Sequence, residues 1–165
     1  MKNDFRLQYP LWMMAFILLL GVLAFGLNSP VTEYVNNQTE TRMTIKIEAF
    51  EGGVVFGAII LYLVLLTIFM VKLKKHNEEN PAHKISAWAI RPPEYLEQDE
   101  GMTFLTRKAV QKVYTFYSWA LPFLATFAII LPLPKLVVIY GILAISFTQY
   151  WIYYLEIRKH FKGGN

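Results

Sequence analysis

Histidine and carboxylate side chains, the groups best suited to metal binding or proton transfer, gather in one stretch of this chain, residues 72–112. The stretch contains two of the three histidines, His76 and His83. Its carboxylates are Glu78, Glu79, Glu94, Glu97, Asp99 and Glu100. A metal site needs converging ligands, and its sequence signature is a defined spacing such as H-E-x-x-H, which does not occur here. We therefore expect no metal site and no cofactor, and interpret the acidic residues as a solvated surface that balances nearby lysines.

The sequence also lacks the patterns that accompany enzyme active sites. It has no Gly-rich phosphate loop and no G-x-S-x-G nucleophile turn. It has no cysteine, which excludes thiol and disulfide-exchange chemistry. We predict no catalytic residue and a protein that is not an enzyme.

The elements that would position any site are four long apolar runs. Leu11–Leu27, Gly52–Val71, Val113–Leu131 and Leu136–Leu155 contain no Asp, Glu, Lys, Arg or His. Each run matches the roughly 17–25 residues that cross a bilayer as a helix. We predict an all-α fold, a four-helix transmembrane bundle, with residues 1–165 as a single membrane domain. The first run is longer than the core of a secretory signal, so we expect the first span to be retained.

The distribution of basic residues predicts the orientation of these spans. Both tails and connector 72–112 lie on one side of a four-span protein. They hold thirteen of the 16 Lys and Arg residues: two in the amino-terminal tail, eight in the connector and three in the carboxyl-terminal tail. Basic loops stay in the cytoplasm, so we expect cytoplasmic termini in a cell membrane and an external connector 28–51. The net charge of +4 thus reflects topology, and no nucleic-acid partner is expected.

Proton-coupled transport normally requires an acid, histidine or lysine inside the membrane, and these spans contain none. An uncharged polar path is the remaining possibility. Its candidate residues are Pro122, Thr126, Thr148 and Gln149. We expect Gln149, the costliest of these groups to expose to lipid, to face another helix. A transporter or channel component for a small neutral or lipid-like solute is therefore the alternative function.

Gly53 and Gly57 form a G-x-x-x-G pair near the start of the second span. Small residues four apart let two helix backbones approach closely in a membrane. We expect this pair to pack inside the bundle. Homodimerisation, or contact with a helix of a partner, is the alternative.

The two longer connectors contain further candidate elements. The external connector has a Ser29-Pro30 helix start, which favours a helix to about Phe50, although Thr44–Ala49 alternates like a strand. Residues 103–112 form a short amphipathic cytoplasmic helix, or an extension of the third span. A distinctive mixed segment precedes it, and the candidate cytoplasmic docking residues are Trp88, Arg91, Glu94, Glu97, Asp99, Glu100, Arg107 and Lys108.

One pattern in this region resembles small multi-pass bacterial membrane proteins of unknown function. It consists of Asp99-Glu100, then Arg107-Lys108-Ala109, then the aromatic-rich run Tyr114-Thr115-Phe116-Tyr117 at the start of a span. The arginine that often follows the D-E pair in that pattern is Gly101 here. The resemblance implies a bacterial cell membrane and assigns no activity and no catalytic residue.

These observations together favour a non-enzymatic integral membrane protein of an accessory, regulatory or immunity type. It would act through protein–protein contacts in the membrane and through its cytoplasmic connector. The expected partners are membrane lipids and either another membrane protein or further copies of this chain.

Overall fold

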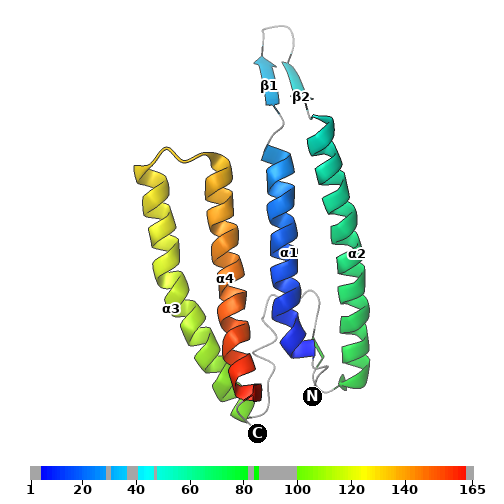
Figure 1. Cartoon of the computed structure of the whole chain (residues 1–165), viewed down its shortest axis with the longest axis vertical. Coiled ribbons are helices and arrows are strands. Elements are labelled where there is room, and N and C mark those ends of the chain that lie inside the picture. The colour runs from blue at the N-terminus through cyan, green and yellow to red at the C-terminus, as the bar shows by residue number, and fades with distance from the viewer. Residues whose placement is uncertain are drawn as a thin grey trace.

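A computed structural model of the chain describes residues 5–28, 31–36, 41–46, 48–81, 84–85 and 100–162. These residues form four long helices and one pair of strands (Figure 1). The helices are α1 (Phe5–Asn28), α2 (Ala49–Glu79), α3 (Glu100–Ile130) and α4 (Lys135–Lys162). The strands are β1 (Val31–Asn36) and β2 (Thr41–Lys46).

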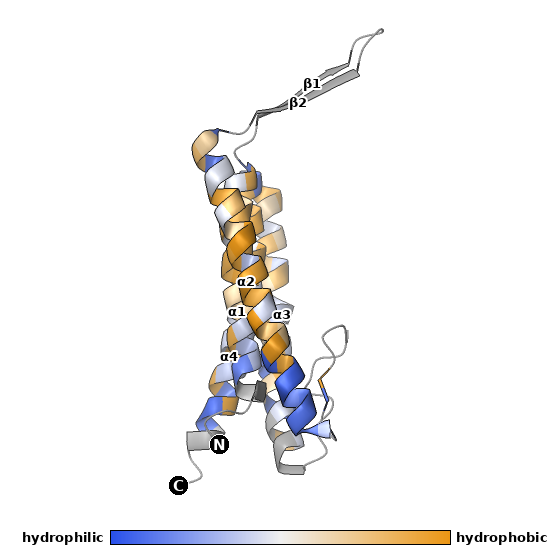
Figure 2. Ribbon diagram, turned by 90° about the vertical axis from the view of Figure 1, so that its right-hand side faces the viewer, coloured by the Kyte–Doolittle hydropathy of each residue, from blue (hydrophilic) through white to orange (hydrophobic). Residues whose placement is uncertain are grey.

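Each of the four helices is long and apolar enough to cross a membrane. At a rise of about 1.5 Å per residue, even α1, with 24 residues, exceeds the roughly 30 Å hydrocarbon core. The helices extend beyond the charge-free runs of the sequence. In Figure 2 the middle of the helices is hydrophobic, and hydrophilic residues gather toward the lower end of the view. The prediction of four membrane-spanning helices is confirmed at this level.

The helix ends follow from local chemistry. Asn80 closes α2 by donating its backbone N–H and its side-chain amide to the carbonyl of His76, and Pro81 follows. Pro132 and Pro134 separate α3 from α4, and the carbonyl of Pro134 accepts the N–H of Val137 in the first turn of α4. This short connection makes α3 and α4 adjacent and antiparallel, as the sequence predicted.

The helices form one open layer in the order α2–α1–α4–α3. The substantial helix contacts are α1 with α2, α1 with α4, and α3 with α4. Figure 1 shows the four helices side by side, and the perpendicular view in Figure 2 is narrow. The predicted four-helix transmembrane bundle is thus confirmed in its four apolar helices, and these helices lie in an open layer. Lipid chains cover an apolar helix surface as well as another helix does, so a membrane protein need not close a core.

The connector between α1 and α2 corrects a second expectation. We expected a helix from residue 30 to about Phe50, but β1 and β2 pair antiparallel from Val31 opposite Lys46 to Asn36 opposite Thr41. Val, Thr and Ile make up half of the residues in the two strands, and β-branched side chains favour extended backbone. The Ser-Pro start signal was too local to decide the structure.

The residues predicted to form a separate amphipathic helix, 103–112, belong to the first part of α3. Ala109 is fully buried against Tyr153 and Ile157 of α4, whereas Phe104 is 67% exposed. The sequence left two options open, a separate amphipathic helix and an extension of the third span. The backbone adopts the extension.

Candidate functional site

Ionic and polar side chains join α3 to α4. The ammonium of Lys112 lies 2.6 Å from a carboxylate oxygen of Glu156, whose side chain is only 7% exposed. The hydroxyl of Tyr117 donates a hydrogen bond to the side-chain oxygen of Gln149. Gln149 therefore faces another helix, as predicted. The Lys112–Glu156 pair was missed, because nothing in the sequence connects residues so far apart.

The four residues of the predicted polar path are not brought together. Thr126 donates its hydroxyl to the carbonyl of Pro122 in its own helix, and both side chains are exposed on α3. Thr148 likewise donates to the carbonyl of Ala144 on α4. Gln149 is engaged with Tyr117. Both threonine hydroxyls are thus hydrogen-bonded to the backbone of their own helix, as is usual for threonine in an apolar setting.

A mostly apolar groove of about 610 Å³ lies between α1 and α4. The hydroxyl of Tyr140 crosses it and donates to the carbonyl of Gly21 at 3.0 Å. Of the predicted polar path, Thr148 lines this groove. The full lining is Ile17, Leu18, Gly21, Val22, Phe25, Tyr140, Leu143, Ala144, Phe147 and Thr148.

The Gly53/Gly57 face of α2 lies on the outer edge of the layer. Both glycines are exposed, and a Cβ atom added at either would meet nothing within 4 Å. The expectation that this pair packs inside the bundle is wrong. In this chain the helix at the edge of the layer turns its small residues outward, which leaves the alternative of contact with a second copy or a partner.

Close helix approach occurs at two other glycines, which motif searching missed. A Cβ on Gly26 of α1 would lie 2.5 Å from a methyl of Val55 on α2. A Cβ on Gly141 of α4 would lie 2.7 Å from a methyl of Leu124 on α3. The only sequence signal for either is an isolated glycine in an apolar run.

At the polar end of the layer, aromatic side chains hold α1 against α2. The ring of Phe69 lies 5.9 Å from that of Trp12 and 5.8 Å from that of Phe16. The ammonium of Lys72 lies 5.3 Å from the centre of the Trp12 ring, within cation–π range. Trp12 therefore contributes to the packing of α1 against α2.

Two of the eight predicted docking residues have described side chains. Arg107 and Lys108 are exposed on the first part of α3, and Glu100 is its first residue. Trp88, Arg91, Glu94, Glu97 and Asp99 lie outside the described residues, as does the side chain of Glu100.

Among the described residues, no group of three or more His, Asp or Glu side chains could hold a metal ion. Comparison with known protein families, with curated proteins and with solved structures finds no match to this chain. Its function must therefore be inferred from its own surfaces.

Proposed function

We propose that this chain is a non-enzymatic accessory, regulatory or immunity-type protein of a bacterial cell membrane. It acts by lateral contact with another membrane protein, and an immunity-type protein in this sense restrains its partner by binding it. The observation that carries the proposal is the uncovered outer face of α2. That face presents small and apolar side chains in a regular pattern, and none of the other helices or strands that the structure describes packs substantially against it.

The pattern extends along the whole apolar part of α2. The exposed residues on this face alternate in steps of four and three, which is the 3.5-residue repeat of helices that pack side by side. They are Gly53, Gly57, Ile60, Val64, Thr67 and Val71. The two glycines would let a partner backbone approach at one end, and the branched side chains would fill the remainder of the contact. A spanning helix of a partner protein fits this face.

The cytoplasmic connector supplies the second proposed contact. Its acidic residues Glu97, Asp99 and Glu100 and its basic residues Arg107 and Lys108 adjoin the start of α3. The proposal requires these residues to face the cytoplasm. Support comes from the basic residues of the tails and connector, and from the common end at which α1 and α3 begin and α2 and α4 end (Figure 1).

The experiment is purification of the tagged protein from native membranes in mild detergent, with mass spectrometry of the proteins that accompany it. A stoichiometric membrane partner is expected. Gly57→Ile should reduce its yield at least tenfold, because the added side chain blocks close approach. Ala125→Ile, which adds bulk to an exposed position on α3, is the matched control and should leave the yield unchanged.

The two contacts are tested separately. Replacing Glu97, Asp99 and Glu100 with Ala should also lower the yield of the partner if the connector docks. An unchanged set of co-purifying proteins in this triple variant would reject the docking role of the connector. An unchanged set in Gly57→Ile would reject the role of α2.

A second candidate function is transport or handling of a small neutral or lipid-like solute. The groove between α1 and α4 favours it, because its apolar lining suits an aliphatic ligand. A pure homo-oligomer without a partner, combined with solute flux in reconstituted vesicles, would establish this function in place of the first. Thr148→Val should then alter the flux, whereas Thr126→Val, outside the groove, should not.

A further inference from the structure

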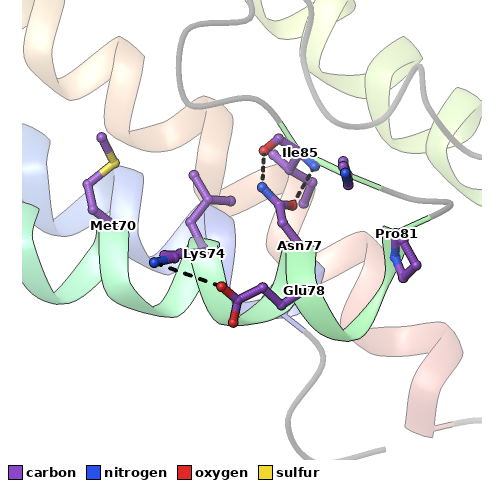
Figure 3. Close-up of a pocket in the computed structure, with 8 residues that line it drawn as sticks. Met70, Lys74, Asn77, Glu78, Pro81 and Ile85 are labelled. Carbon is purple, nitrogen blue, oxygen red and sulfur yellow. Dashed lines mark hydrogen bonds and ion pairs between the residues drawn. The ribbon is translucent and has the colours of Figure 1, made fainter.

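A cavity of about 680 Å³ lies at the polar end of α2, apart from the outer face of that helix and from the α1–α4 groove. Figure 3 shows that its walls come from the last turns of α2 and from Pro81 and Ile85, which lie beyond the end of that helix. The lining residues are Met70, Leu73, Lys74, Asn77, Glu78, Pro81, Lys84 and Ile85.

Asn77 fixes the position of Ile85, a part of the cavity wall that lies outside α2. Its side-chain amide donates to the carbonyl of Ile85 and its side-chain oxygen accepts the N–H of Ile85, both at 2.8 Å (Figure 3). Ile85 is itself buried and packs with Phe69 and Leu73. One asparagine thus satisfies both backbone groups of a residue outside the helix, so the cavity has a defined shape in the described residues.

The lining changes from apolar to charged along the helix axis. Met70 lies within the charge-free run, which ends at Val71, and Lys74 and Glu78 follow one and two turns later. Met70 and Glu78 are about 12 Å apart along α2 at about 1.5 Å per residue. That distance spans the boundary between the acyl chains and the headgroups of a bilayer, because α2 continues beyond the hydrocarbon core.

We propose that this cavity binds one anionic phospholipid, with its phosphate between Lys74 and Lys84 and the upper part of an acyl chain against Met70 and Leu73. The charged lining comprises two cations and the carboxylate of Glu78, a net charge of +1 that complements a lipid of charge −1. Glu78 lies 3.9 Å from Lys74 in an exposed pair. Such pairs are weak, so a phosphate can replace the carboxylate at Lys74.

The chain contains a matched control for this site. Lys75 and Glu79 form the same i,i+4 pair at 3.8 Å, one residue further along α2, and neither lines the cavity. Both lysines are similarly exposed, 80% for Lys74 and 75% for Lys75. A diffuse attraction of the basic end to an anionic membrane would depend equally on the two lysines, whereas a bound lipid depends on Lys74.

The test is native mass spectrometry of the full chain released from nanodiscs that contain equal amounts of phosphatidylglycerol and phosphatidylcholine. The expected result is one retained phosphatidylglycerol per chain. Lys74→Gln and Lys84→Gln should each lower its retention about fivefold, equivalent to about 1 kcal/mol per basic residue, and Lys75→Gln should not. Glu78→Gln should raise retention, and Glu79→Gln should leave it unchanged.

Three results would overturn the proposal. Equal losses in Lys74→Gln and Lys75→Gln would show diffuse surface attraction. Equal retention of the zwitterionic lipid would show that the anionic charge is not recognised. Displacement of the lipid by millimolar inorganic phosphate would show that the phosphate group alone is bound. Asn77→Ala tests the shape of the cavity separately from its charge. It removes the two hydrogen bonds that hold Ile85, and should lower lipid retention although both lysines remain.

Discussion

The two outer pairs of the layer, α1 with α2 and α3 with α4, are held together by different chemistry. Aromatic rings around Phe69 join α1 to α2, and a close approach at a glycine occurs in both pairs, at Gly26 and at Gly141. An ion pair and an interhelical hydrogen bond join α3 to α4. The same residue types, lysine and glutamate, occur at the polar ends of both pairs, on α2 and on α3 and α4, but they are used differently.

That difference shows which parts of the molecule are available for binding. Glu156 is buried and pairs across helices with Lys112, so this charge contributes to the fold. The pairs Lys74–Glu78 and Lys75–Glu79 lie within one helix, are longer and are exposed. We therefore expect α2 to carry the binding surfaces, on its outer face and at its polar end, and the polar contacts of α3 and α4 to be structural.

The close approach of α1 to α2 gives the largest expected effect on stability. Gly26→Ala would place a methyl 2.5 Å from a methyl of Val55, whose branched side chain has little freedom to move. We expect a loss of about 1–3 kcal/mol in the free energy of unfolding, as for other overpacked sites. Unfolding of the purified protein in bicelles measures it. Gly21→Ala on the same helix is the control, because its Cβ would stand at an ordinary 3.4 Å from Tyr140.

A smaller loss is expected where α3 meets α4. Glu156→Ala removes the acceptor of Lys112, but Lys112 is 48% exposed and can turn toward water. The expected loss in the free energy of unfolding is therefore about 1–2 kcal/mol, which is less than for removing one partner of a fully buried ion pair. Glu79→Ala should change stability by less than about 0.5 kcal/mol. Equal effects of the two variants would contradict the distinction between structural and available charges. Replacing Lys112 and Glu156 together with apolar residues should restore part of the loss.

The sequence predicted the spans but not their order. Charge-free runs of about twenty residues identify a membrane helix without reference to its neighbours, and Pro132 and Pro134 predict the turn between α3 and α4. The order α2–α1–α4–α3 could not be predicted in this way. The spans are apolar on nearly every side, so the sequence does not indicate which face of each helix contacts another helix. The sequence therefore predicted a four-helix bundle without an order of its helices, and the structure shows an open layer.

The candidate sites were only partly predictable for the same reason. The G-x-x-x-G motif marked one face of α2, but the direction in which that face points depends on the tertiary arrangement, and the predicted packing inside the bundle was wrong. The pair formed by Lys112 and Glu156 joins residues 44 positions apart, and the two hydrogen bonds of Asn77 reach a residue eight positions away. Such contacts follow from packing, and no spacing rule for single sequences describes them.

The hydrogen bond between Tyr117 and Gln149 should contribute less than the ion pair. Hydrogen bonds between helices in membranes contribute about 0.6 kcal/mol on average, because the separated helices also find partners. Gln149→Leu should therefore lower the free energy of unfolding by about that amount, measured in bicelles. Tyr117→Phe should have the same effect, and the double variant should add nothing, since both changes remove one interaction. A loss above 2 kcal/mol for Gln149→Leu would indicate that Gln149 has a further role in the fold.

The smallest effect on the fold is expected at the outer face of α2, and this prediction compares two glycines of one protein. Gly57→Ala adds a methyl to open space, whereas Gly26→Ala adds one to a packed contact. Alanine also favours the helix over glycine by about 1 kcal/mol. The free energy of unfolding of the isolated chain in bicelles should therefore stay unchanged or rise with Gly57→Ala. A loss comparable to that of Gly26→Ala would mean that this face is packed within the chain, and would remove α2 as the proposed contact for a partner helix.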